Sequence, residues 1–199
     1  MAEAAIEINY WCAEKATYHT TDARTIAPIN IYRCGNGRCG EESTFTISAL
    51  RSAGIPARQV YAPFWSHCDD NHAWVEVWCD GKWYFTGACE PEPILNKGWF
   101  TNASSRAMMV HSRWFDKIQP EDENINGREA GALVLNQLRR YADVKEITIR
   151  VQKSRTERLQ PVPELYWRYI TTHSSFQSQI WLRMKTVRSM RPREKEAFM

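Results

Sequence analysis

Several features that would assign this chain of 199 residues to a particular class are missing from it. No run approaches the roughly 18 consecutive apolar residues of a membrane-spanning helix, so no membrane span is expected. The N-terminus has no basic segment followed by an apolar stretch, which predicts no secretory signal and makes the cytoplasm the default location. The sequence also holds no nucleic-acid-binding motif and no EF-hand-like calcium loop, so neither kind of partner is expected.

Cysteine is too sparse to build a disulfide scaffold. The chain has six cysteines, and no two of them form a CxxC pair. A zinc site can be drawn from Cys34, Cys39, His67, Cys68 and His72, because Cys and His are the usual zinc ligands. Their spacing matches no common zinc finger, so no metal or cofactor is predicted.

The net charge of +3 is unevenly distributed. Residues 150–199 hold 11 Lys and Arg against 4 Asp and Glu, whereas the rest of the chain holds 15 against 19. A basic end is found in proteins that contact nucleic acids or acidic membranes, but it is more often a solvated tail. Residues 153–199 are therefore predicted to form a poorly ordered basic tail.

What the sequence does have is enough apolar surface for one folded domain, since 9 Trp, 8 Tyr and 7 Phe are present. Apolar periodicity and turn residues predict helices at 3–18 and 40–53, strands at 57–63, 72–79 and 82–86, a helix at 103–115, a charged loop at 121–128 and a strand at 145–151. In the second helix Phe45, Ala49 and Ala53 recur at a spacing of four, with Leu50 alongside, which predicts a stripe packed against a sheet. Gly54 and Pro56 end that helix.

Cys39 stands at the start of the helix predicted at 40–53, directly after a Gly-rich turn. A thiol in that position is favoured as thiolate by the free backbone N–H groups and the positive end of the helix dipole. His72 stands at the beginning of a strongly alternating strand, where an imidazole can take the thiol proton and deliver it to a leaving group. The two residues are thus the minimum equipment of a cysteine nucleophile.

The strand that begins at His72 is predicted to form a hairpin. Ala73, Val75, Val77 and Cys79 face one side, while His72, Trp74, Glu76 and Trp78 face the other. Asp80-Gly81 predicts a two-residue type I′ turn, so Cys79 pairs with Lys82. If this register continued, His72 would lie opposite Cys89, and position 87 would be diagonal to His72.

Four segments in this order resemble the transglutaminase-like superfamily: Gly37–Glu42 (GRCGEE), Ala49–Arg58 (ALRSAGIPAR), His72–Val77 (HAWVEV) and Gly81–Trp83 (GKW). The resemblance extends over roughly residues 6–120. It implies a papain-like core and a Cys–His–Asp triad in which Cys39 and His72 are the first two members. The superfamily includes transglutaminases, peptide N-glycanases and many microbial proteases.

The third member of the implied triad is not evident. The position at which the family has Asp, four residues after Trp83, is Gly87 in this chain. Glu90 is the nearest carboxylate and is predicted to orient His72, provided that a bulge at Gly87-Ala88 turns it to the same face. A Cys39–His72 dyad without a carboxylate is the competing arrangement, and Cys89 is an outside candidate for the nucleophile.

Together these observations predict an α+β protein with a papain-like, transglutaminase-like core, in which a helix bearing Cys39 packs on an antiparallel sheet bearing His72. Residues 1–120 are predicted to form the catalytic core, and residues 121–152 a connector and the start of a β-rich extension.

The predicted function is cysteine-dependent acyl transfer on a peptide or protein amide, with Cys39, His72 and Glu90 as catalytic residues. Hydrolysis is favoured over cross-linking, because a free-standing core of the bacterial type lacks the further domains of the calcium-regulated cross-linking enzymes. The alternative is a non-catalytic binding module of the same fold, for which Gly87 in place of Asp would be the sign of a degraded triad.

Overall fold

The computed structural model describes residues 1–21, 24–118, 120, 123–148 and 180–183. The chain divides into two compact units, Met1–Asp143 and Val144–Met199. In the second unit the described backbone forms β9 (Lys145–Thr148) and β10 (Ile180–Arg183), which pair in parallel. The strand predicted at 145–151 is confirmed over β9.

The predicted basic tail, residues 153–199, lies outside the described residues apart from β10. Within the part of the chain that the structure describes, no helix is both long and apolar enough to cross a membrane.

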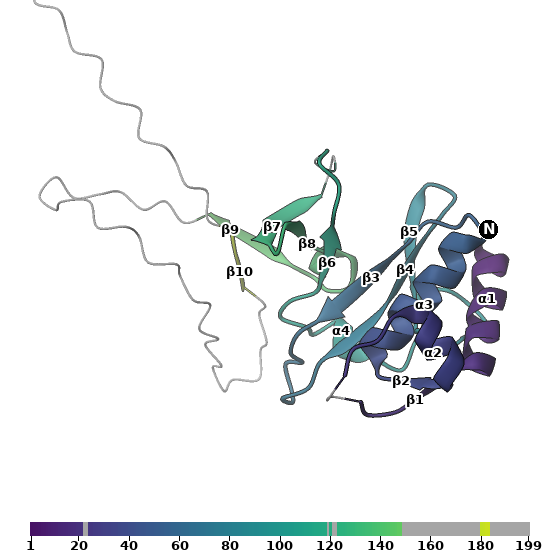
Figure 1. Cartoon of the computed structure of the whole chain (residues 1–199). Coiled ribbons are helices and arrows are strands. Elements are labelled where there is room, and N and C mark those ends of the chain that lie inside the picture. Colours follow the sequence, from purple (N-terminus) through teal and green to yellow (C-terminus); the bar gives the residue numbers. More distant parts are fainter. Residues whose placement is uncertain (22–23, 119, 121–122, 149–179, 184–199) are drawn as a thin grey trace, which may run out of the picture. The chain divides into compact units, whose positions relative to one another are not determined.

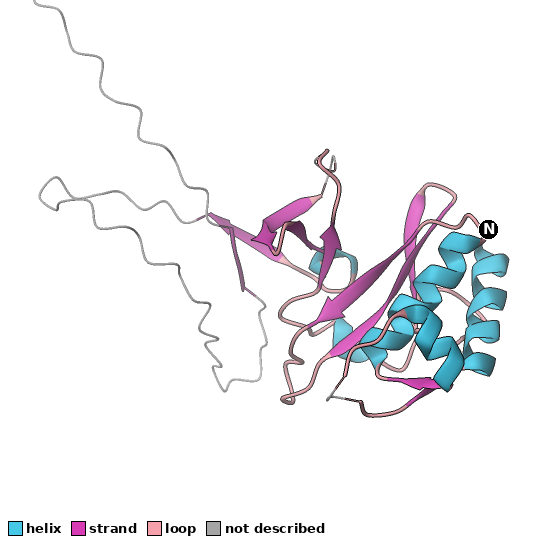
Figure 2. Ribbon diagram, in the orientation of Figure 1, coloured by secondary structure: helices cyan, strands magenta, loops and turns pink. Residues whose placement is uncertain are grey.

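The first unit consists of helices packed on an antiparallel sheet (Figures 1 and 2). Its helices are α1 (Ala2–Lys15), α2 (Pro28–Cys34), α3 (Cys39–Ser52), α4 (Thr101–Ser104) and the 3₁₀ turn η1 (Leu138–Arg140). Its strands are β1 (Thr17–Tyr18), β2 (Asn36–Gly37), β3 (Ala57–Ala62), β4 (His72–Cys79), β5 (Lys82–Thr86), β6 (His111–Trp114), β7 (Asn124–Glu129) and β8 (Ala132–Asn136). The main sheet has the order β5-β4-β3-β6-β8-β7, and β1 and β2 form a separate parallel pair. The predicted α+β class, with a Cys39-bearing helix on a His72-bearing antiparallel sheet, is confirmed.

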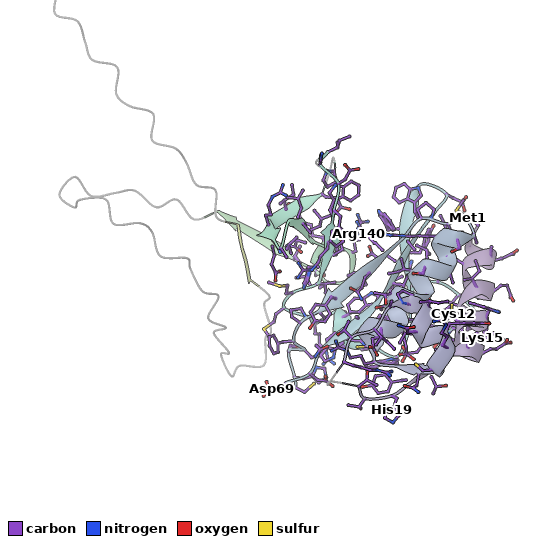
Figure 3. The ribbon with its side chains drawn as sticks, in the orientation of Figure 1. Met1, Cys12, Lys15, His19, Asp69 and Arg140 are labelled. Atoms are coloured by element: carbon purple, nitrogen blue, oxygen red, sulfur yellow. The ribbon has the colours of Figure 1, made fainter. Side chains whose placement is uncertain are left out.

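Helix α3 is buried on two sides. Ile47 and Leu50 pack with Val75 and Val77 of β4, so these residues face the sheet. Phe45 instead packs with Cys12 of α1 (labelled in Figure 3) and with residues of α2. Of the predicted stripe, Leu50 faces the sheet as expected, whereas Phe45 and Ala49 face α1 and α2, because these two helices cover that side of α3.

The alternation of β4 is confirmed by its two sets of contacts. Ala73, Val75, Val77 and Cys79 are buried, and the last three belong to the core beneath α3. On the opposite face, Nε1 of Trp74 donates a hydrogen bond of 2.9 Å to the hydroxyl of Tyr141. That hydroxyl in turn donates to Glu76 at 2.7 Å, so this face is packed by residues far along the chain.

Arg58 of β3 ties the sheet to the segment after residue 120. Its guanidinium donates to Glu76 at 2.7 Å, to Glu123 at 2.8 Å and to Gln137 at 2.9 Å. It also lies 4.0 Å from the ring centroid of Trp83. Because a buried guanidinium is costly without partners, these contacts make residues 123–137 part of the same core.

The predicted hairpin is confirmed. Cys79 pairs with Lys82 across the turn, and the register continues to the pair Val75–Thr86. Asp80 and Gly81 have φ of 52° and 82°, the positive values that a type I′ turn requires.

Three other expectations about elements are wrong. The segment 19–38, for which no helix or strand is predicted, contains α2. In the predicted helix 103–115, α4 ends at Ser104 and residues 111–114 form β6. The loop predicted at 121–128 contains most of β7. Strands β7 and β8 lie within 121–152, the segment predicted as a connector and the start of a β-rich extension, and they continue the main sheet beyond β6.

Candidate active site

The turn that delivers Cys39 to the start of α3 is held by Glu41. This buried carboxylate accepts hydrogen bonds from the hydroxyl of Thr21 at 2.8 Å and from the backbone N–H groups of Ile26 and Arg38 at 3.0 and 3.2 Å. Burial acts to raise the pKa of Glu41, but these bonds together lower it, so the residue remains ionised. Glu41 therefore fixes the backbone on either side of the thiol.

His72 lies at the first position of β4 inside an aromatic enclosure. Its ring centroid is 4.7 Å from that of Trp99, 5.0 Å from Phe100 and 5.8 Å from Trp74. Nε2 is buried and has no hydrogen-bond partner among the described residues. Burial lowers the pKa of His72 to about 4, against a smaller opposing effect of Asp70, so the imidazole is neutral at pH 7.

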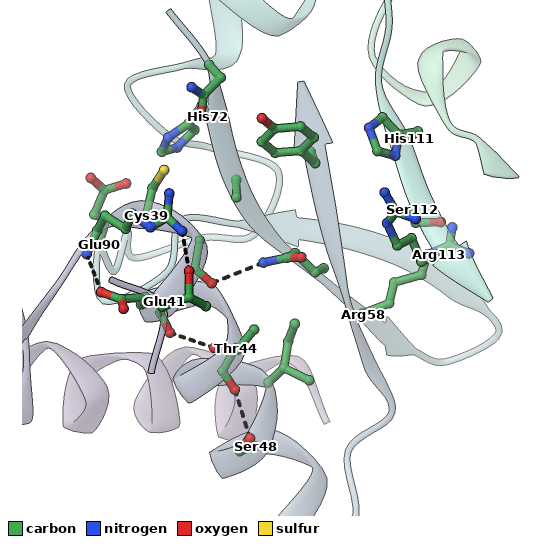
Figure 4. A pocket seen from close by; sticks show the side chains of 18 of the residues that line it. Cys39, Glu41, Thr44, Ser48, Arg58, His72, Glu90, His111, Ser112 and Arg113 are labelled. Atoms are coloured by element: carbon green, nitrogen blue, oxygen red, sulfur yellow. Dashed lines mark hydrogen bonds between the residues drawn. The ribbon is translucent and has the colours of Figure 1, made fainter. Parts of the chain in front are cut away.

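The structure brings Cys39 and His72 together. The backbone N–H of Ala73, the residue after His72, hydrogen-bonds to the Cys39 sulfur. Figure 4 shows the thiol and the imidazole pointing toward one another across the top of α3. Both side chains line a cavity of about 860 Å³.

The electrostatic surroundings of Cys39 favour the thiol over the thiolate. Burial raises its pKa, and the nearby charge of Glu42 adds to that effect. The backbone N–H groups of Ala73 and Gly40 and the charge of Arg38 act in the opposite direction. The resting pair is thus a thiol beside a neutral imidazole.

Glu90 also lines the cavity, but it does not hydrogen-bond to His72 in this structure. Both of its carboxylate oxygens accept from Nε1 of Trp99, at 3.1 and 3.0 Å. Burial raises the pKa of Glu90, and the bond from Trp99 partly offsets this effect. The direct contact by which Glu90 was predicted to orient His72 is therefore absent, and the aromatic enclosure, which desolvates the imidazole, lowers the pKa of His72.

Glu90 occupies the space beside Gly87. A Cβ placed on Gly87 would lie 2.7 Å from Cβ and 3.0 Å from Oε2 of Glu90. A side chain at position 87 is therefore excluded, and the Glu90 carboxylate lies next to the position from which the family's Asp would extend. The exchange accounts for the glycine at this point.

A turn after β5 produces this placement. Strand β5 ends at Thr86, and Asn9 of α1 hydrogen-bonds to Thr86, to Gly87 and to the backbone N–H of Cys89, at 2.8–3.0 Å. The expected pairing of His72 with Cys89 does not form, because the strand has ended. Cys89 does not line the cavity; burial raises its pKa strongly, so it is a poor nucleophile.

Sequence reasoning missed three residues of the site, namely Trp99, Tyr61 and His111. Trp99 comes from the irregular segment after β5, where no periodicity marks a site residue. Tyr61 lies on β3. Burial raises the pKa of its hydroxyl, and the charge of a nearby Cys39 thiolate raises it further. His111 pairs with Tyr61 across β3 and β6, and its ring packs edge-on against that of Tyr61 at 5.3 Å.

No three His, Cys, Asp or Glu side chains in the described ranges are grouped closely enough to hold a metal ion. This finding covers the described members of the zinc site drawn from Cys34, Cys39, His67, Cys68 and His72.

The geometry can be compared with known proteins. The model of the transglutaminase-like superfamily matches residues 1–88. This part of the chain is similar to the transglutaminase-like superfamily. The segment that matches the superfamily includes Cys39 and His72 and ends two residues before Glu90.

The solved structures that this transglutaminase-like chain matches include a candidate cysteine protease from Cytophaga hutchinsonii, with 21% identity and a TM-score of 0.38. The alignment covers 46% of this chain and 34% of that one, so the chain spans about a third of the length of that protein. No curated protein matches the chain.

Proposed function

We propose that this protein is a cysteine-dependent hydrolase of peptide or protein amides, with Cys39 as the nucleophile and His72 as the general acid and base. The observation that carries the proposal is the placement of the Cys39 sulfur at the start of α3, against the N–H of Ala73 and facing His72 in one cavity. The match of residues 1–88 to the transglutaminase-like superfamily supports a cysteine-based enzyme. The proposal goes further than this match in naming hydrolysis, in which water and not another amine accepts the acyl group.

The protonation states define the first step. Because burial keeps both groups neutral, His72 removes the proton of the Cys39 thiol as the sulfur attacks the amide carbonyl. The resulting imidazolium then protonates the departing amine and returns to the neutral state. Water attacks the thioester with His72 again as base, which releases the acid and restores the thiol.

The negative oxygen that forms during attack needs hydrogen-bond donors near Cys39. The backbone N–H of Cys39, at the start of α3, is one. The second donor in this proposal is the hydroxyl of Tyr61, which lines the cavity close to the sulfur. Gln59 also lines the cavity, but its amide already donates to the carbonyl of Gly40 at 3.1 Å and to Ser43 at 2.6 Å.

Glu90 acts in this proposal as a positioning residue through Trp99. The carboxylate fixes the indole by its N–H, and the indole ring lies against His72 at 4.7 Å. A fixed ring on that side limits the rotation of the imidazole, so its nitrogen stays directed at Cys39. This differs from the direct carboxylate–imidazole bond that the resemblance implies.

The experiment that tests the function uses a library of peptides from a digested proteome. The wild-type protein and Cys39→Ala are incubated with the library, and new peptide N-termini are identified by labelling and mass spectrometry. We expect new termini with the wild type and none with Cys39→Ala. Equal numbers of termini from both proteins would refute the assignment of Cys39.

A non-catalytic binding module remains the second candidate, because Nε2 of His72 lacks the acceptor that a triad carboxylate would provide. In that case the wild type and Cys39→Ala would retain the same peptides on a column, and neither would cleave them.

A further inference from the structure

The cavity that holds Cys39 is lined by four arginines, and three of them are already engaged. Both Nε and Nη2 of Arg51 donate to the carbonyl of Ala57, at 2.9 and 2.6 Å. Arg58 is bound by Glu76 and Glu123, and Arg113 pairs with Glu129 at 2.8 Å. These side chains have their charges or donors satisfied within the fold.

Arg38 is the fourth arginine, and it directly precedes the nucleophile. Its guanidinium donates one hydrogen bond, from Nη2 to the hydroxyl of Thr25. Nε is buried and has no partner among the described residues, and no carboxylate in those residues pairs with the guanidinium. Since an arginine has five N–H donors in a planar fork, most of this group's capacity is unused.

Arg38 lines the cavity together with Cys39, its neighbour in the chain, and Tyr61, which carries the proposed oxyanion donor. Its positive charge acts to lower the pKa of both Cys39 and Tyr61, against the larger effect of burial. The guanidinium is therefore near both the sulfur and the proposed oxyanion donor.

None of the described acidic residues that line the cavity pairs with the guanidinium of Arg38. The Glu41 carboxylate accepts from Thr21 and from two backbone N–H groups, one of them the backbone of Arg38. Glu90 is bound by Trp99, and Asp70 accepts from the backbone of Asn71 at 2.7 Å. A free cationic fork beside the nucleophile, in a cavity whose own carboxylates are engaged, matches a carboxylate that arrives with the substrate.

We propose that Arg38 is a specificity-determining residue and that the preferred substrates are acidic peptides, with a carboxylate close to the amide that is cleaved. A carboxylate there can accept from the buried Nε–H and from an Nη–H at once, in the paired geometry typical of arginine. The inference rests on the proposed role of Cys39 and specifies which amides reach it.

The test uses two alkylating probes of nearly equal size, iodoacetate and iodoacetamide, of which only the first carries a carboxylate. In each case the thiolate displaces iodide and forms a carbon–sulfur bond. The alkylation rate at Cys39 is measured by peptide mapping for both probes, and the ratio of the two rates is compared with that of a free thiol, N-acetylcysteinamide. Any change in the pKa or accessibility of Cys39 affects both probes and cancels in the ratio.

We expect the ratio of iodoacetate to iodoacetamide at Cys39 to exceed that of the free thiol. Arg38→Gln should lower the ratio about tenfold, the change expected for one charge-assisted hydrogen bond. Arg38→Lys, which keeps the charge but loses the fork, should give an intermediate value. Arg33→Gln, at an exposed arginine of α2 outside the cavity, should leave it unchanged.

The outcomes separate the two proposals. Suppose that Cys39 reacts with both probes, that its ratio of rates equals that of the free thiol, and that Arg38→Gln leaves this ratio unchanged. The role of Arg38 is then refuted, while the assignment of Cys39 as the nucleophile stands. If His72→Ala leaves the alkylation rate at Cys39 unchanged with both probes, His72 does not assist the thiol and the proposed function itself fails.

Discussion

Trp99 is the residue of this site that differs most from the sequence prediction. It contacts both Glu90 and His72, which the sequence predicts to contact one another directly. Its indole N–H binds Glu90, and its ring lies against His72. A carboxylate can therefore affect the imidazole without touching it. This arrangement makes the effect of Glu90 dependent on Trp99.

A double-mutant cycle tests that dependence. We expect Glu90→Gln to lower kcat/KM by about one to three orders of magnitude, the range for loss of one oriented electrostatic group. Trp99→Phe, which keeps a ring but removes the N–H, should cause a similar loss. Because Glu90→Gln removes the charge of this contact and Trp99→Phe removes its donor, both changes act on the same interaction, and the double variant should be little worse than either single one. Additive losses in steady-state kinetics would show that Glu90 acts independently of Trp99.

The protonation state of His72 gives a second prediction at this scale. Burial lowers its pKa to about 4, and only the neutral imidazole can accept the proton of Cys39. Activity should therefore be lost only as the pH falls through about 4, and kcat/KM should stay level from there to neutral pH. The pH–rate profile measures this directly, with circular dichroism to exclude unfolding. An acid limb centred near the ordinary histidine pKa of about 6.5 would contradict the buried, neutral imidazole.

At the scale of elements, the turn after β5 decides which carboxylate can approach the site. Asn9 holds the turn from α1, and Gly87 leaves room for Glu90. The Glu90 carboxylate thus lies in the turn after β5, beside the end of the strand.

Gly87→Asp would restore the family's residue at the expected position. A Cβ there would lie 2.7 Å from Cβ and 2.8 Å from the carbonyl oxygen of Glu90, so the turn must shift. We expect a loss of about 1–3 kcal/mol in the free energy of unfolding, typical of overpacking. Gly127→Asp is the matched control, because nothing lies within 4 Å of a Cβ at that glycine. Equal stability of the two variants in urea denaturation would show that the turn at Gly87 accommodates a side chain.

The sequence predicted the elements that depend on local pattern, and it failed where distant contacts decide. The alternation of β4 and the Asp80-Gly81 turn define the hairpin by themselves, and the Gly-rich turn with Gly54 brackets α3. Strand β7 is exposed and charged, so its pairing with β8 leaves no apolar signal in the sequence. Helix α2 buries only Ile31, too little to produce a visible stripe.

The site divides in the same way. Cys39 is the first residue of α3, and His72 is the first residue of β4. Both elements could be predicted from local pattern, so the sequence also indicated that these two side chains lie close together. The roles of Trp99 and of the turn at Gly87 depend on hydrogen bonds to Glu90 and Asn9, and no sequence period encodes them.

At the scale of the whole molecule, the first unit extends beyond the predicted core of residues 1–120. The buried Arg58 draws two of its partners, Glu123 and Gln137, from later in the chain. Strands β7 and β8 also cover the edge of β6. The sheet that carries His72 is therefore joined to a segment that the family match does not reach.

Truncation tests this boundary. A fragment of residues 1–143 should unfold cooperatively, since it retains the whole first unit. A fragment of residues 1–120 leaves Arg58 short of two partners, a loss of about 3–5 kcal/mol for a broken buried ion pair, and exposes the edge of β6. We expect no cooperative thermal transition for the shorter fragment. A sharp transition for residues 1–120 would show that the later strands are dispensable.

The central claim, that Cys39 forms a covalent acyl intermediate with the help of His72, is tested most directly by pre-steady-state acylation. The protein is mixed with a p-nitrophenyl ester, and nitrophenol release is followed before peptide mapping locates the acyl group. We predict a burst of one equivalent, with the acyl group on Cys39, a much slower burst in His72→Ala and none in Cys39→Ala. Acyl groups spread over the exposed Cys34 and Cys68, with Cys39 unmodified, would contradict the account.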